Sequence, residues 1–149
     1  CSTVYPWGML NRLRERIANC LASRSVCVLS VHASGENGSH SVWAVPVRCR
    51  SHGLEVDCLV PRWADAAFYL EQDPGVLLIF QNPDAGNLRW LQYRGRAHIQ
   101  PAPDWAKLLP ADVAGRQPEN RFLAVRVQPS RIDLIDETEG WGVLESLEF

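Results

Sequence analysis

Apolar and polar residues alternate along segment 88–100, LRWLQYRGRAHIQ. A period of two is that of a β-strand that buries one face and exposes the other. The shorter segment 54–60, LEVDCLV, alternates in the same way. Because a strand buries its apolar face only as part of a sheet, these segments predict a mainly β fold. The apolar face of the longer strand carries Leu91, Tyr93, Ala97 and Ile99, and its polar face carries Gln92, Arg94, Arg96 and His98.

A three-stranded meander is predicted in the first half of the chain. Segments 24–33 and 41–50 have the composition of strands, and the polar stretch between them contains Asn37 and Gly38, a typical hairpin turn. A second short turn leads from 41–50 into 54–60, so these three strands are expected to be antiparallel neighbours. In the middle strand one face takes Trp43, Val45, Val47 and Cys49.

Three helices and three more strands complete the predicted elements. Apolar residues at three- and four-residue steps predict an amphipathic helix over 9–23. A second helix is expected over 64–72, and a short third helix begins after Asp104, a plausible cap. The run 76–80 is apolar throughout, which predicts a strand covered on both faces. The remaining strands are expected at 121–127 and 131–136.

These elements predict a small antiparallel β-barrel with short helices. The sequence contains no repeat, no low-complexity segment and no internal linker, so residues 1–149 are expected to form a single domain. The formal charge of -2 does not favour a nucleic-acid partner or an anionic membrane surface. No apolar run is long enough to span a bilayer, and the first residues lack the apolar core of a signal peptide. The protein is therefore predicted to be cytoplasmic.

The sequence contains no recognisable catalytic motif and no metal motif. The five cysteines form no C-x-x-C pair, and they are expected to be reduced and mostly buried. His32, His40 and His52 lack the spacing of metal or haem ligands. The polar face of 88–100 remains open to two interpretations, an exposed sheet face or a site for an anionic ligand. No catalytic residue is assigned.

The order of the elements and several short pieces resemble the pyridoxamine 5'-phosphate oxidase-like FMN-binding split-barrel family. The resemblance spans nearly the whole chain. It is carried by a helix, a three-stranded meander, a short helix ending in LEQDP, an apolar strand, a long strand ending in YRGRAHI, and VRVQPSRIDLID. The pieces themselves are Leu70, Pro74, the run 76–80, Gly95 with Arg96 and Ala97, and Val127 and Pro129 before Arg131 and Ile132.

The resemblance implies a homodimer with a flavin mononucleotide, FMN, at each of two interface sites. The isoalloxazine ring would lie along the second strand of the meander, bonded by its backbone groups. The third strand and the helix after it would supply phosphate contacts, and the C-terminal segment of the partner subunit would flank the ring. The corresponding residues are Trp43, Ala44, Val45, Pro46, Val47, Val60, Arg62 and Trp141.

The chain departs from the family pattern at the phosphate-binding helix start. Relatives commonly carry serine with arginine or lysine there, whereas this chain carries Ala64, Asp65 and Ala66. A phosphate needs charge-assisted donors, and Asp65 would repel it, which leaves Arg62 as the local cation. Two hypotheses follow. The chain is an FMN-dependent oxidoreductase acting on a small molecule, or it is a non-enzymatic dimer that has lost FMN and binds another ligand, such as haem, or a protein partner.

Overall fold

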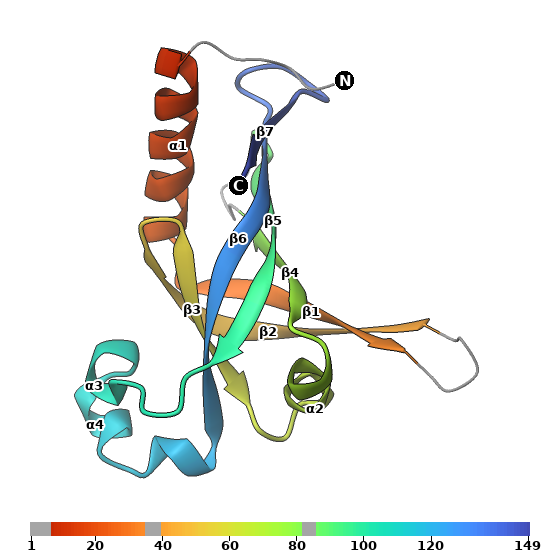
Figure 1. Cartoon of the computed structure of the whole chain (residues 1–149). Helices are drawn as coiled ribbons and strands as arrows, with labels where there is room; N and C mark the ends of the chain where they lie inside the picture. The colour runs from red at the N-terminus through yellow and green to blue at the C-terminus, as the bar shows by residue number, and fades with distance from the viewer. Residues whose placement is uncertain (1–6, 35–39, 82–85) are drawn as a thin grey trace.

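One sheet and several short helices make up the computed structural model, which describes residues 7–34, 40–81 and 86–149 (Figure 1). Helices and strands follow one another in the order of the bounds that follow. They are α1 (Trp7–Ala22), β1 (Val26–Ser34), β2 (His40–His52), β3 (Glu55–Pro61), α2 (Asp65–Gln72), β4 (Gly75–Gln81), β5 (Arg89–Ile99), α3 (Trp105–Leu108), α4 (Ala111–Ala114), η1 (Pro118–Asn120), β6 (Phe122–Asp136) and β7 (Leu144–Glu148).

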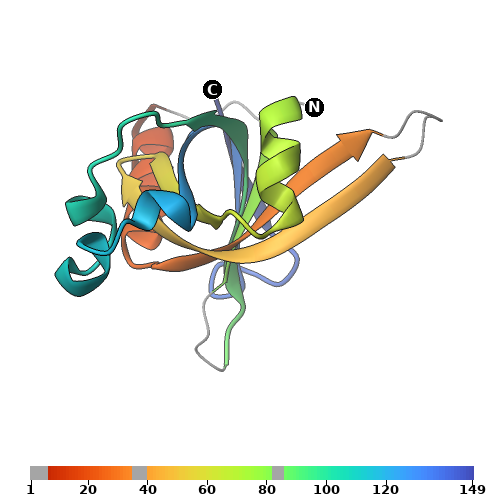
Figure 2. The ribbon, with the colours of Figure 1, turned by 90° about the horizontal axis from the view of Figure 1, so that it is seen from below.

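The seven strands are antiparallel and lie in the order β3-β2-β1-β4-β5-β6-β7. The first half of β6 also pairs with β3, which closes six strands into a barrel. The second half of β6 pairs with β7, outside that ring. Figure 2 shows the curved strands from below. The predicted mainly β barrel with short helices is confirmed.

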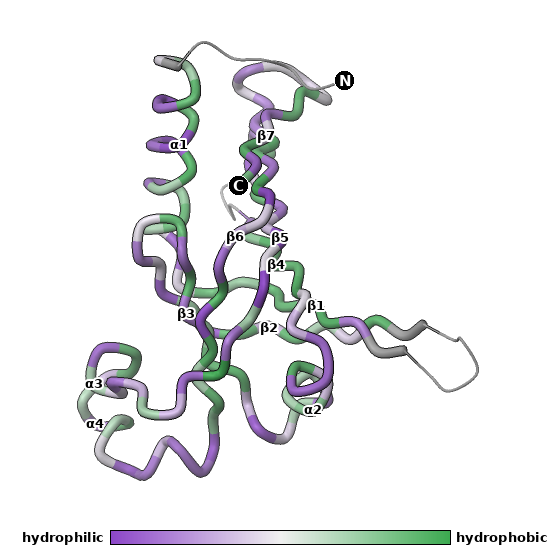
Figure 3. Tube along the Cα trace, in the orientation of Figure 1, coloured by the Kyte–Doolittle hydropathy of each residue, from purple (hydrophilic) through white to green (hydrophobic). Residues whose placement is uncertain are grey.

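The apolar stripe of α1 packs on the sheet as its periodicity predicts. Leu13, Ile17 and Leu21 are spaced by four residues, lie on one face of the helix and are fully buried. In Figure 3 the hydrophobic side of α1 is turned toward the strands. Inside the barrel, the Tyr93 hydroxyl donates to the carbonyl oxygens of Leu54 at 2.5 Å and Val127 at 3.2 Å, which satisfies its polar atom within the core.

β6 is one unbroken strand where the sequence predicts two, 121–127 and 131–136, so that prediction is wrong. The register with β5 shifts by one residue between Arg94 and Gly95. Ser130 is consequently the extra residue of a β-bulge, and its hydroxyl donates to the Arg94 carbonyl at 3.1 Å. The bulge carries the strand past a segment whose proline and serine indicate a turn in the sequence alone.

Other elements differ from prediction at their ends. β7 is not predicted at all, because its five residues have no clear alternation. Asp104 occupies the N-cap position of α3 but makes no side-chain capping bond. The run 76–80 is not covered on both faces, since Leu77 and Ile79 stay half-buried while their neighbours are buried. The Asn37-Gly38 turn lies outside the described residues, where Cys1 lies too.

The segment between β5 and β6 covers part of the outside of the barrel. Its residues Leu109 and Trp105 pack with Leu59 of β3 and Ala124 of β6 in a small second cluster. This cluster stabilises α3 and α4, which are too short to be stable helices alone. No helix among residues 7–34, 40–81 and 86–149 is long and apolar enough to cross a membrane.

Candidate functional site

β2 and β3 separate part-way along β2, and this split is the centre of the candidate site. The two strands pair only from Arg48 opposite Leu59 to His52 opposite Glu55. Before Arg48, β2 pairs with β1 alone, whereas the end of β3 pairs with β6. Figure 2 shows the two strands diverging. One edge of β2 is therefore left without a neighbouring strand over residues 40–47.

The register identifies which backbone groups point into the split. The Cys49 amide donates to the Ser25 carbonyl at 2.9 Å, so the polar backbone groups of Cys49 face β1. Because these groups alternate along a strand and the pairing with β1 is regular, those of Val42, Ala44 and Pro46 face away from it. We call these three residues the free edge of β2. No hydrogen bond to their backbone groups is formed within the described residues.

Proline at one of these positions fits that orientation. Pro46 has no amide hydrogen, and a proline is tolerated in a strand where its nitrogen faces an unpaired edge. The remaining polar groups of the free edge are two amide hydrogens and three carbonyl oxygens. Unpaired groups of this kind form a ready template for a ligand that presents its own donors and acceptors in a row.

The side chains around the free edge are apolar. Val42 is 64% exposed, and Ala44 and Pro46 are exposed beside it. On the opposite face Val47 is buried and Val45 half-buried, which confirms the predicted sharing of faces. Trp43 is 39% exposed and stacks on Tyr69 of α2, with ring centroids 5.8 Å apart and planes 16° from parallel. Residues 42–47 carry no titratable side chain.

The start of α2 has little capacity for a phosphate. Ala64 is the N-cap and forms no side-chain capping bond, and Asp65 places a carboxylate in the first turn. Ala66 and Ala67 are buried and offer no side-chain donor. Only the helix dipole and the first backbone amides attract an anion there, and Asp65 opposes both.

Arg62 is anchored away from α2. Its amide donates to the Arg121 carbonyl at 2.8 Å, and its Nε donates to the Glu119 carbonyl at 2.8 Å. The guanidinium thus lies against η1 and borders a hollow of about 400 Å³ between η1 and the segment after β5. It holds one charge near the split, but half of its bonding capacity is directed at the protein itself.

The structure brings most of the predicted site residues together. Residues 43–47 lie along the split, and Arg62 follows the end of β3 across it. Val60 is fully buried, so its side chain faces the core and not the split. Trp141 is 83% exposed in the loop between β6 and β7, at the far end of the chain from α2 (Figure 1). A contact between Trp141 and this site remains a prediction about a partner subunit.

Sequence reasoning missed the aromatic side of α2. Tyr69 stacks on Trp43 and Phe68 meets Tyr69 edge-on, with ring centroids 5.2 Å apart. Phe68 and the nearby Trp63 are exposed. Adjacent aromatic residues on an otherwise amphipathic helix were the available signal, because helical periodicity buries only one of them.

The other candidates from the sequence stay structural. Cys20, Cys27, Cys49 and Cys58 are free thiols, as predicted. Hydrogen bonding with Cys27 and burial both raise the pKa of the Cys49 thiol, so it is protonated at neutral pH and is a poor nucleophile. Within the part of the chain that is described, no cluster of three metal-ligating side chains occurs. The polar face of β5 is exposed at Arg94, Arg96 and His98.

Comparisons with known proteins place the fold. No family model and no curated protein sequence matches the chain. Among solved structures, a haem-binding protein from Mycobacterium smegmatis has a TM-score of 0.68 at 18% identity, covering 98% of this chain. The chain spans 60% of that protein's length.

Two shorter structures match over nearly their full lengths. A protein related to general stress protein 26, of the pyridoxinephosphate oxidase family, from Clostridium acetobutylicum has a TM-score of 0.64 at 14% identity, covering 97% of both chains. An FAD-binding protein from Mycobacterium smegmatis has a TM-score of 0.57 at 14% identity, covering 91% of this chain and 95% of its own. At such identities the likeness shows a shared fold, the split barrel of these proteins.

Proposed function

We propose that this chain, a split barrel of the pyridoxamine 5'-phosphate oxidase-like fold, binds a flavin at the free edge of β2. The observation that carries the proposal is the row of unpaired backbone groups at Val42, Ala44 and Pro46, set in an apolar surface. The pyrimidine edge of an isoalloxazine ring presents a donor between two acceptors, which complements the amides and carbonyls of a strand edge. Solved structures of the same fold include an FAD-binding protein.

The finer proposal is an FMN-dependent oxidoreductase acting on a small molecule. A bound flavin supplies the hydride and electron transfer, so the protein has to bind and orient the ring. Residues 42–47 suit that task, because they offer backbone hydrogen bonds and apolar contact and no acid or base of their own. The Trp43–Tyr69 stack holds α2 against the strand and limits the ring to the outer side of the split.

We also propose that the chain is a homodimer. The outer face of the sheet is a half-buried to exposed apolar surface on β1, β2 and β4. The register places Pro46, Val28 and Ile79 in one cross-strand row, and Ala44, Ser30 and Leu77 in the next. A second copy would cover this face and bring another chain next to the free edge. Light scattering should give about 33 kDa, twice the 16.7 kDa of one chain; a mass of one chain at micromolar concentration would contradict the dimer.

The phosphate of FMN is expected to add little to the affinity. Asp65 repels it and Arg62 is already bonded to η1, so the attractive and repulsive contributions nearly cancel. Titration followed by flavin fluorescence should therefore give dissociation constants for FMN and riboflavin within about threefold of each other. Asp65→Lys should increase the preference for FMN to about tenfold, because it replaces a repulsive charge by an attractive one. Equal affinities in that variant would contradict this assignment of the phosphate position.

A haem-binding dimer is the second candidate, and the start of α2 favours it. A tetrapyrrole is also a planar apolar ring, and it needs no phosphate site at the position where Ala64, Asp65 and Ala66 stand. One of the structures with this fold is a haem-binding protein. Adding haemin in a parallel titration separates the two ligands, since saturable binding of haemin without binding of either flavin would favour this second candidate.

A further inference from the structure

Arg24 contains a buried polar atom that has no partner. It follows the end of α1, and its side chain is half-buried. Its Nε is shielded from solvent and makes no hydrogen bond, the one buried side-chain nitrogen or oxygen in this condition among the described residues. Leaving a charged donor unsatisfied in a buried position is costly, and native proteins usually pair such a group with an ion or water. Arg24 therefore indicates a ligand.

A pocket lies beside this side chain, between α1 and the ends of β5 and β6. Its volume is about 340 Å³, and it is separate from the split beside α2. Polar side chains from three elements line it. They include Arg16, Asn19, Ser23 and Arg24 from α1 and its end, Arg89 from β5 and Asp136 from β6.

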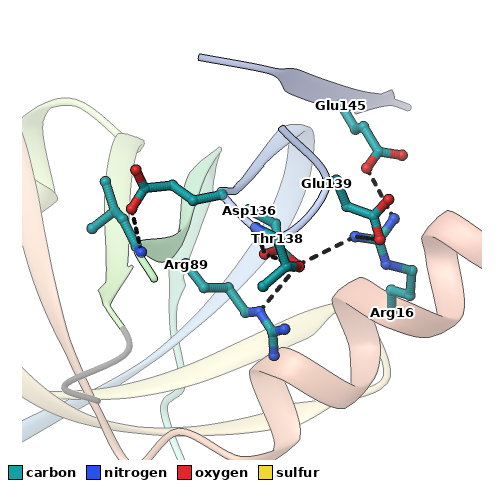
Figure 4. Close-up of polar contacts among 8 residues, drawn as sticks. Arg16, Arg89, Asp136, Thr138, Glu139 and Glu145 are labelled. Carbon is teal, nitrogen blue, oxygen red and sulfur yellow. Dashed lines mark hydrogen bonds and ion pairs between the residues drawn. The ribbon is translucent and has the colours of Figure 1, made fainter. Parts of the chain in front are cut away.

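The other two arginines of the pocket are held by carboxylates. Asp136 is buried and accepts from Arg89 Nε at 3.1 Å, and it lies 3.5 Å from Arg16 Nη2. Arg16 also pairs with Glu145 at 2.9 Å and with Glu139 at 3.8 Å. Figure 4 shows this network, in which Arg16 and Arg89 approach Asp136 from two sides. These pairs fix both guanidinium groups at the wall of the pocket.

Arg24 has no such counter-charge. It forms no ion pair with a carboxylate of the described residues. Cys20 is the neighbouring group that titrates, and burial raises the pKa of its thiol although the charges of Arg24 and Arg89 act in the opposite direction. The thiol is consequently neutral at pH 7 and does not balance the arginine. The pocket keeps an excess of positive charge at Arg24.

We infer that this pocket binds a phosphoryl group, with Arg24 as its main ligand and Arg89 as the second. Guanidinium forks arriving from different elements suit a tetrahedral group with several oxygens better than a planar carboxylate, which one fork satisfies. The Ser23 hydroxyl and the Asn19 amide add neutral polar groups at the rim. This inference is independent of the flavin proposal, which concerns the opposite side of the molecule.

Calorimetric titration of the whole protein with inorganic phosphate, at ionic strength held constant with sodium chloride, tests the inference. The wild type should bind one phosphate per chain with a millimolar dissociation constant, and Arg24→Gln should weaken binding by about tenfold or more. Arg12→Gln is the matched control, because Arg12 lies exposed on the same helix outside the pocket and loses the same charge. It should bind within about twofold of the wild type.

A second measurement separates a ligand role from a structural one. Because Arg24 Nε has no protein partner, Arg24→Gln should melt without phosphate at the same temperature as the wild type, or higher. Phosphate should raise the melting temperature of the wild type and of Arg12→Gln but not that of Arg24→Gln. Equal phosphate affinity in wild type and Arg24→Gln, no saturable binding up to about 20 mM, or a clearly lower melting temperature of ligand-free Arg24→Gln would each overturn the inference.

Discussion

Replacing Gly95 by alanine is expected to lower the free energy of unfolding by about 3 kcal/mol, the upper part of the range for overpacking. A Cβ at this position would overlap the Gln128 carbonyl oxygen and lie 2.8 Å from Cγ1 of Val127. Both obstacles belong to β6, and the nearer one is backbone, which cannot rotate away. Because β5 and β6 share the longest pairing in the barrel, the strain has to move the strands apart at the bulge.

Urea unfolding followed by tryptophan fluorescence measures this loss, and Gly115→Ala is its control. Gly115 follows α4, has an ordinary φ of -80°, and its Cβ would meet nothing closer than the Ala111 carbonyl oxygen at 3.7 Å. That variant should stay within about 0.5 kcal/mol of the wild type. If both alanine variants are equally stable, the close approach of β6 to Gly95 is not a feature of the folded protein.

Asp136→Asn is expected to destabilise the protein by about 2 kcal/mol at neutral pH. The carboxylate is buried, accepts from the Thr138 hydroxyl at 2.6 Å and amide at 3.0 Å, and holds Arg16 and Arg89 at the end of the barrel. The loss is smaller than for a fully buried pair, because the two arginine side chains are 29% and 44% exposed and remain solvated. Glu71→Gln, an exposed carboxylate on α2, is the matched control and should change stability by less than about 0.5 kcal/mol.

The contribution of Asp136 depends on pH in a defined direction. Burial alone would raise the pKa of its carboxyl, but the Thr138 hydroxyl and amide and the charges of Arg89 and Arg16 together lower it below its ordinary value of 3.8. A group with a lowered pKa in the folded state stabilises the protein above its unfolded pKa and loses that effect as pH falls through the folded pKa. The stability difference between wild type and Asp136→Asn should therefore be constant from pH 7 to about pH 5 and shrink below about pH 4. A difference that grows on acidification would contradict this.

Strand periodicity predicts the barrel well where a strand has one buried face. The alternation of 88–100 corresponds to β5, in which Leu91, Tyr93 and Ala97 are buried and Arg94 is exposed. It fails where a strand is interrupted or short. The polar residues around Ser130 indicate a turn, and only the pairing with β5 shows that the extra residue is a bulge. β7 is held by pairing with β6, a tertiary contact that five residues do not encode locally.

The candidate site is predictable in part. Strand parity places Val47 inward and Ala44 outward from sequence alone. The free edge is not predictable, because it depends on β3 leaving β2 after Leu59 to pair with β6. The bond from Arg62 to the Glu119 carbonyl likewise joins segments far apart in the chain. The unpaired Nε of Arg24 is visible only when all neighbours are in place.

Binding of FMN to wild type, Ala44→Pro and Ala44→Ser tests most directly the claim that the free edge of β2 holds a flavin. Proline removes the one amide hydrogen that Ala44 presents to the split and leaves the hydrogen bonds to β1 intact, because that amide faces away from β1. Serine keeps the amide at the same position. We expect all three proteins to melt at similar temperatures, with Ala44→Ser binding FMN like the wild type and Ala44→Pro binding about tenfold more weakly. Equal affinity of the proline and serine variants, or no binding by the wild type at about 100 µM FMN, would contradict the claim.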